Sequence, residues 1–311
     1  MRKKLLVLAL LAAALIVSIA ATVYFVFPEK IIAWAIDRER GKAGLTKKNV
    51  QVGDHLVTYL EGGRGDVVVL MHGFGGDKDN WTRFAAFLTP RYRVIALDLP
   101  GFGESDFRPS ASYAYSEQAR RLDQFASAVG LDRFHLAGNS MGGHVSGRYA
   151  VEHPRRVRTL GLFASGGVKS PRDSEVSAII QKGEANPLVV AAEEDFPRLM
   201  NFIFFAPPAL PSFLHKALVR KTLARQEQNR TIFRQIALEH LALQPDLNRI
   251  EAPTLILWGD HDRVLDPSGA EVFSGLIKNS RKEIMKNCGH VPMIERPGEA
   301  ARIYLTFLEN K

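Results

Sequence analysis

Short apolar runs alternate with amphipathic segments along most of the chain. Runs rich in β-branched residues are typical of buried strands, and apolar residues three or four positions apart are typical of helices that cover a sheet. The pattern predicts strands over 67–73, 93–99, 134–138, 158–167, 252–260 and 282–290, with a hairpin over 50–63. It predicts helices over 77–88, 116–130, 141–153 and 297–310. This alternation indicates an α/β fold with a mostly parallel, doubly wound sheet.

The alternation stops between residues 170 and 248, where the pattern is mostly helical. We interpret this stretch as a helical cap inserted into a core formed by residues 49–169 and 249–311. Residues 201–220, NFIFFAPPALPSFLHKALVR, combine apolar and aromatic side chains with three prolines. Such a segment either covers the sheet or forms a hydrophobic tunnel or membrane-facing lid, and the sequence leaves both interpretations open.

The N-terminal segment is a candidate membrane span. Residues 5–27 carry no charged side chain. As a helix they would be about 35 Å long, enough to cross a hydrocarbon core of about 30 Å. We predict a transmembrane anchor over 1–28 and a juxtamembrane segment over 29–48. A cleaved signal peptide with Ser18-Ile19-Ala20 near its cleavage site is the alternative. The basic residues before the span favour an exported position for the rest of the chain.

The charge balance favours anionic surroundings. The chain of 311 residues has a formal net charge of +8, which suits acidic lipid surfaces. The positive charge is the only feature that supports nucleic-acid binding, so we predict no nucleic-acid partner. No metal-ligand spacing and no phosphate-binding loop occurs, so we predict no metal and no cofactor. The single cysteine, Cys288, rules out an internal disulfide.

The stretch GNSMGG, residues 138–143, is the first candidate for chemistry. It lies between a predicted strand and a predicted helix, where the pattern G-x-S-x-G forms a sharp turn that exposes a serine. We therefore predict that Ser140 is a nucleophile. The stretch HGFGG, residues 72–76, follows another predicted strand. The backbone N–H groups of Phe74 and Met141 are the predicted oxyanion-hole donors.

A serine nucleophile needs a histidine and an acid, which follow it in the order Ser…Asp…His in this type of fold. His290 comes after the strand predicted over 282–290. Three acids, Asp260, Asp262 and Asp266, follow the strand predicted over 252–260, and Asp266 before a proline suits a helix cap. Three other histidines have structural explanations, namely orientation of a loop, burial in a strand and the end of a helix: His72, His135 and His153.

Five motifs, HGFGGDKDNW, DLPGFGES, GNSMGG, WGDHDRVLD and NCGHVPMIERP, occur in this order within residues 50–311. Together they resemble the α/β-hydrolase superfamily, and within it the membrane-anchored monoacylglycerol lipases and the bacterial membrane-bound phospholipase A and carboxylesterase enzymes. The resemblance implies a catalytic triad of Ser140, Asp262 and His290, because the G-x-x-D spacing of the superfamily selects Asp262. It also implies a lipid ester substrate among membrane lipids, and it admits a homodimer.

Two other functions use the same motifs. A C–C bond hydrolase of ring-cleavage products also has a GNSMGG elbow, although its oxyanion loop usually carries Ser-Gly-Pro-Gly where this chain has Phe-Gly-Gly-Asp. A non-catalytic hydrolase-like binding protein is the second alternative, although such proteins commonly lack a member of the triad. An acyltransferase would differ only in excluding water. We therefore predict a serine esterase that acts on lipids.

Overall fold

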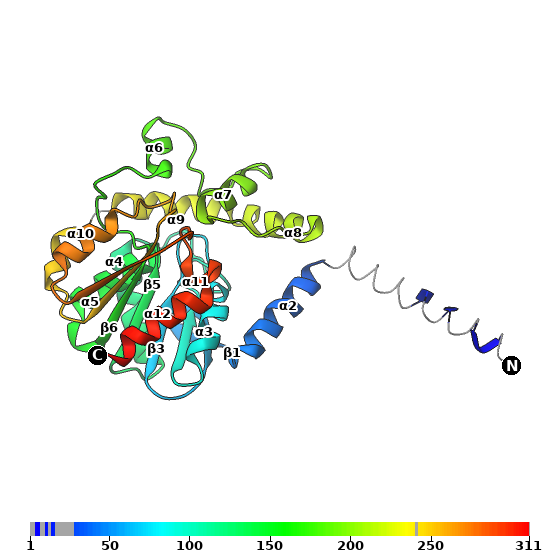
Figure 1. The fold of residues 1–311 in the computed structure, drawn as a ribbon, viewed down its shortest axis with the longest axis horizontal. Coiled ribbons are helices and arrows are strands. Elements are labelled where there is room, and N and C mark those ends of the chain that lie inside the picture. Colours follow the sequence, from blue (N-terminus) through cyan, green and yellow to red (C-terminus); the bar gives the residue numbers. More distant parts are fainter. Residues whose placement is uncertain (1–3, 7–9, 12–13, 16–27, 240–241, 311) are drawn as a thin grey trace.

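A single eight-stranded sheet forms the centre of the molecule (Figure 1). The computed structural model describes residues 4–6, 10–11, 14–15, 28–239 and 242–310. The strand order is β1-β2-β4-β3-β5-β6-β7-β8, with antiparallel pairing at β1–β2 and β2–β4 and parallel pairing elsewhere. The strands are β1 Leu45–Val52, β2 His55–Gly62, β3 Val67–Met71, β4 Arg93–Leu97, β5 Phe134–Asn139, β6 Val157–Phe163, β7 Thr254–Gly259 and β8 Ser280–Met285.

Helices cover both faces of the sheet, as the alternation of strands and helices predicts. The helices of the core and its N-terminal side are α2 Pro28–Lys42, α3 Thr82–Leu88, α4 Tyr115–Ala128, α5 Met141–Glu152, α10 Gly269–Leu276, α11 Pro292–Glu295 and α12 Pro297–Glu309, with 3₁₀ turns η1 Lys78–Trp81, η2 Pro154–Arg156 and η3 Gln244–Arg249. Apolar residues of α4, α5 and α10 form one buried cluster, and those of α3, α11 and α12 form another.

The two clusters lie on opposite faces because successive side chains of a strand point to opposite sides. In β3, Val69 and Met71 belong to the first cluster, whereas Val68 and Leu70 belong to the second. A strand that is buried on both faces is apolar at every position, which is why residues 67–71 form a continuous apolar run.

Five predicted strands end earlier than the sequence pattern suggests, and the difference is largest at β6 and β8. β6 ends at Phe163 and β8 ends at Met285, so the predicted strands over 158–167 and 282–290 are too long. Ala164 and Asn287 follow with positive φ angles of 45° and 51°, a conformation that no strand continues. At the other edge of the sheet, β1 begins at Leu45, so strand pairing includes residues 45–48.

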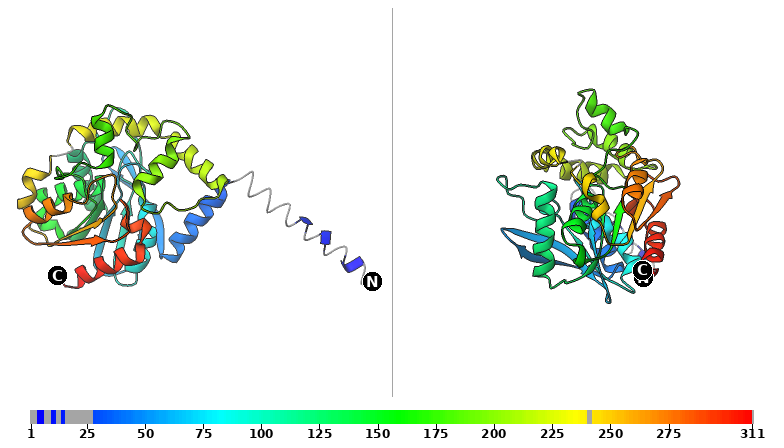
Figure 2. Two further views of the ribbon diagram at one scale, coloured as in Figure 1. Left: turned by 45° about the horizontal axis from the view of Figure 1, so that its top comes forward. Right: turned by 90° about the vertical axis from the view of Figure 1, so that its left-hand side faces the viewer.

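The segment after β6 carries four helices above the carboxyl ends of the parallel strands (Figures 1 and 2). They are α6 Glu175–Gln181, α7 Asp195–Ile203, α8 Ser212–Leu223 and α9 Gln226–Leu238. Apolar side chains of α6, α7 and α8 contribute to two small buried clusters, one of which also includes Val264 of the core. This segment lies over the end of the sheet that carries the candidate site.

The helix α2 lies beside α3 and also packs against α8 (Figure 1). Most of the predicted span over 5–27 lies outside the described residues. Among the residues that are described, no helix has both the length and the apolar character needed to cross a bilayer.

Candidate active site

The turn between β5 and α5 holds Ser140 in a strained conformation. Its φ of 54° and ψ of −114° place a residue with a side chain in a region that is sparsely populated. The neighbouring glycines allow the turn: a Cβ on Gly138 would lie 2.2 Å from the Gly142 carbonyl oxygen, and one on Gly142 would lie 2.5 Å from the Met71 carbonyl oxygen. Packing against these carbonyl groups therefore requires glycine at positions 138 and 142, the two glycines of the pattern G-x-S-x-G.

A buried carboxylate lies against His290. Asp262 Oδ2 is 2.8 Å from His290 Nδ1, and both side chains are almost fully buried. The other carboxylate oxygen, Oδ1, accepts the amides of Val264 and Leu265 at 2.9 and 3.0 Å. Because the acid accepts the Nδ1–H of the imidazole, Nε2 is the nitrogen left to take up a proton.

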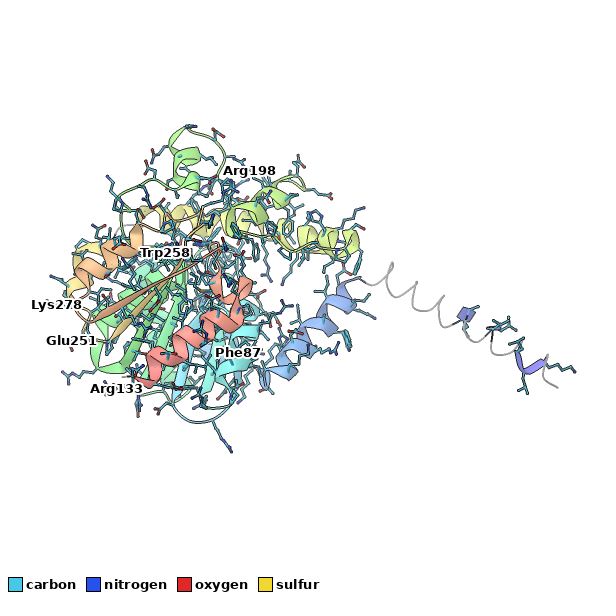
Figure 3. All side chains as sticks on the ribbon, in the orientation of Figure 1. Phe87, Arg133, Arg198, Glu251, Trp258 and Lys278 are labelled. Atoms are coloured by element: carbon cyan, nitrogen blue, oxygen red, sulfur yellow. The ribbon has the colours of Figure 1, made fainter. Side chains whose placement is uncertain are left out.

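A side chain of the core bonds to the loop that carries Asp262. The buried Trp258 of β7 donates from Nε1 to the Leu265 carbonyl oxygen at 3.1 Å (Figure 3). The structure thus brings Asp262 to His290 and leaves the other two acids elsewhere. Asp260 contacts His261 Nδ1 at 2.7 Å, and Asp266 accepts the amide of Ser268 at 2.8 Å before α10.

The turn with Ser140 lies beside the loop with His290. Asn139 Nδ2 donates to the His290 carbonyl oxygen and to the Phe163 carbonyl oxygen, both at 3.0 Å. Within the described residues the structure records no hydrogen bond between Ser140 Oγ and His290 Nε2, a contact that commonly tightens only when substrate binds. Sequence reasoning did not single out Asn139, whose signal is a polar side chain at the buried end of a strand.

The HGFGG loop lies against the same turn. A Cβ on Gly73 would lie 3.2 Å from Ser140 Cβ. The fully buried His72 donates from Nδ1 to the Gly73 carbonyl oxygen at 2.7 Å, and its Nε2 accepts the amide of Leu99 at 3.0 Å. Burial lowers the pKa of His72, which keeps the ring neutral in this bonding pattern. His72 therefore fixes the loop rather than reacting.

The predicted oxyanion donors lie at this junction. Phe74 belongs to the loop after β3, and Met141 is the first residue of α5. In the described part of the chain, no acceptor is bonded to either backbone N–H. Two free N–H groups beside a half-buried serine are the arrangement that stabilises a negatively charged oxygen. The same part of the chain contains no group of three His, Cys, Asp or Glu side chains that would suit a metal ion.

Comparison with known proteins agrees with the fold. A model of the alpha/beta hydrolase family matches residues 68–303, and the chain belongs to that family. It is 35% identical to Lipase 1 of Psychrobacter immobilis, over 88% of this chain and 87% of that protein. It is 31% identical to the monoacylglycerol lipase abhd6-A of Xenopus laevis, over 93% and 90%. A crystal structure of a membrane phospholipase A, described as a bacterial virulence factor, matches with a TM-score of 0.90 and 48% identity, over 100% and 99%.

Proposed function

We propose that the protein is a carboxylic ester hydrolase that cleaves lipid esters through an acyl-enzyme on Ser140. The observation that carries the proposal is the buried Asp262–His290 hydrogen bond beside a strained, half-buried serine. The family and the lipase and phospholipase names of the relatives support the substrate class, which comprises monoacylglycerol, lysophospholipid and phospholipid.

The first half-reaction transfers the acyl group to the protein. Ser140 Oγ attacks the ester carbonyl carbon while His290 Nε2 takes the hydroxyl proton. The carbonyl oxygen becomes an oxyanion that accepts the N–H groups of Phe74 and Met141. Collapse of this intermediate breaks the ester bond, and the imidazolium gives its proton to the departing alcohol. Asp262 stays ionised and stabilises the imidazolium.

The second half-reaction restores the serine. A water molecule attacks the acyl carbon while His290 takes one of its protons, and the second tetrahedral intermediate again places its oxyanion at Phe74 and Met141. Collapse releases the fatty acid, and the proton returns to Ser140 Oγ. An acyltransferase with the same site would differ only in this half-reaction, because it would exclude the water molecule.

The cap supports a membrane-bound substrate. We propose that residues 170–248 form a lid and that residues 1–28 anchor the chain, with the core on the exported side. The loop between α7 and α8, residues 205–211, is apolar and mostly exposed, and Phe205 is 43% exposed. Arg220 of α8 pairs with Glu29 of α2 at 2.8 Å, which ties α8 to the helix that follows the proposed anchor. A homodimer stays a prediction.

The test of the proposal is Ser140→Ala. Loss of the nucleophile should lower turnover of p-nitrophenyl butyrate on the order of a millionfold, because no other group forms the acyl-enzyme. A fluorophosphonate probe should label the unmodified protein and not the variant. Ser127→Ala, on the exposed surface of α4, is the control and should keep full activity. Activity that survives the change at Ser140 would refute the mechanism.

A substrate panel separates the alternatives. Monoacylglycerol, lysophospholipid and diacyl phospholipid should be hydrolysed, and vinylogous diketones should not. Turnover restricted to the diketones would favour the C–C bond hydrolase. An unlabelled unmodified protein without esterase activity would favour a binding protein.

A further inference from the structure

The cap contacts the backbone of His290 directly. The amide of His290 donates to the carbonyl oxygen of Ile203, the last residue of α7, at 2.9 Å. A Cβ on Gly289 would lie 2.7 Å from both that carbonyl oxygen and the Phe205 nitrogen. The end of α7 is thus packed against the backbone on which the imidazole is mounted.

The carboxylate of Glu295 fastens this contact. It belongs to α11, and it accepts three backbone amides: Gly289 at 2.8 Å, Ala206 at 2.9 Å and Phe205 at 3.3 Å. One comes from the residue before His290, and two come from the cap. In the described part of the chain the structure records no ion pair to Glu295, so these three amides are the recorded hydrogen-bond partners of its carboxylate. Amides bonded to an ionised acceptor are held more strongly than those bonded to a neutral one.

The same end of α7 contacts the loop of the acid. Arg263, next to Asp262, donates to the Asn201 carbonyl oxygen at 3.0 Å and pairs with Glu175 of α6 at 2.6 Å. Its guanidinium lies 4.9 Å from the centre of the Phe202 ring. One short cap segment, residues 201–206, therefore lies against the loops of both members of the Asp262–His290 pair.

We infer that Glu295 is a positioning residue that sets the place of His290 by clamping residues 205–206 of the cap to the backbone beside it. The inference rests on the proposed function and adds a specific dependence of turnover on a cap contact. Glu295 touches neither the substrate nor the reacting atoms. Its effect should therefore fall on the proton transfers of His290 and not on substrate binding.

The test compares Glu295→Gln with Glu299→Gln in the full-length protein. Glutamine keeps the size of the side chain but replaces one acceptor oxygen with an NH₂ group that faces a backbone N–H. Among the described residues, Glu299 of α12 forms an ion pair with Arg296 alone, three positions earlier in the chain. Its variant receives the same chemical change without a contact to the cap. For each variant, titration with a fluorophosphonate counts the active sites, and p-nitrophenyl butyrate gives kcat per site and KM.

We expect kcat per titrated site of Glu295→Gln to fall about tenfold or more, because small misplacements of a catalytic group are costly. KM should stay unchanged, and Glu299→Gln should match the unmodified protein. Equal kcat per site in the two variants would overturn the inference. So would a loss that appears only in the number of titrated sites, because that result would assign Glu295 to folding alone. The Ser140→Ala result judges the proposed function separately.

Discussion

The ammonium of Lys78 is buried in the turn that follows the HGFGG loop, residues 72–76. It contacts the carboxylates of Asp98 at 2.9 Å and Glu104 at 2.8 Å, while the Lys78 amide donates to Asp98 at 2.7 Å. Burial favours a lowered pKa for Lys78, but the surrounding carboxylates outweigh it and raise the pKa above its ordinary value. Lys78 is therefore charged and fixes the first turn after the HGFGG loop.

Removal of this charge should be costly. Lys78→Met would leave the fully buried Asp98 carboxylate without its cation, and we expect the free energy of unfolding to fall by about 3–5 kcal/mol. Urea denaturation in detergent measures the change. Lys216→Met, at an exposed position on α8, is the matched control and should stay within about 0.5 kcal/mol of the unmodified protein. Equal effects of the two substitutions would contradict this account of the cluster.

Individual residues were predictable where spacing restricts the choice. Ser140 sits in a pattern that only a strained turn explains, and its positive φ agrees with that prediction. Asn139 and Glu295 were not predictable, because their partners lie 151 residues away and up to 90 residues away in the chain. A side chain that bonds to distant backbone groups leaves no periodic trace in the sequence.

At the scale of elements, periodicity predicted the strands and most helices of the core but not their ends. A helix follows each of β3, β4 and β5, and α12 follows β8, as the pattern indicates, whereas α10 after β7 was not predicted. The ends of β6 and β8 depend on single residues with positive φ. Ser116, a residue type that suits a helix N-cap, lies inside α4, which begins at Tyr115, and its side chain bonds to Glu239 after α9. Tertiary contacts with the cap therefore override a local capping preference.

Among its contacts with the core, the helix α2 makes one bidentate ion pair. Arg40 donates to both carboxylate oxygens of Asp79, at 2.7 and 2.6 Å, and lies 3.7 Å from Glu104. This bidentate pair joins α2 to the charged cluster around Lys78. The sequence predicted only a juxtamembrane segment over 29–48 and not this contact, because an ion pair across 39 residues has no local signature.

Loss of the bidentate pair should loosen α2. In Arg40→Gln we expect faster hydrogen exchange at the backbone amides of Pro28–Lys42, because local opening no longer has to break two charge-assisted hydrogen bonds. Exchange in the central strands should not change. Arg38→Gln is the control on the same helix, since Arg38 stacks on Trp34 at 5.5 Å and holds no contact with Asp79. Identical exchange in both variants would show that packing alone attaches the helix.

At the scale of the whole molecule, the cap and the N-terminal helix lie on one side. The α8 helix packs against α2, and the two meet near the first residues of α2 (Figure 2). Lys221 of α8 also reaches Asp77, beside the oxyanion loop, at 3.1 Å. The cap, the helix before the sheet and the catalytic loops therefore form one connected structure.

Removal of residues 2–27 should separate attachment from chemistry. We expect the shortened protein to leave the membrane fraction without detergent and to keep turnover of p-nitrophenyl butyrate, because every proposed catalytic residue lies between residues 74 and 290. Hydrolysis of esters embedded in vesicles should fall sharply. The full-length protein, with Met1 retained on mass analysis, is the control. A mature form that begins near Ala21 and stays in solution would support a signal peptide instead.

The ion pair between Glu29 and Arg220 has a kinetic consequence for an anchored enzyme. If the proposed anchor holds α2 at the bilayer, this ion pair keeps the proposed lid at the lipid surface as well, and substrate would enter from the bilayer and not from the surrounding water. Turnover would then follow the mole fraction of ester within the bilayer, and diluting that ester with inert lipid would slow the enzyme even at constant bulk concentration.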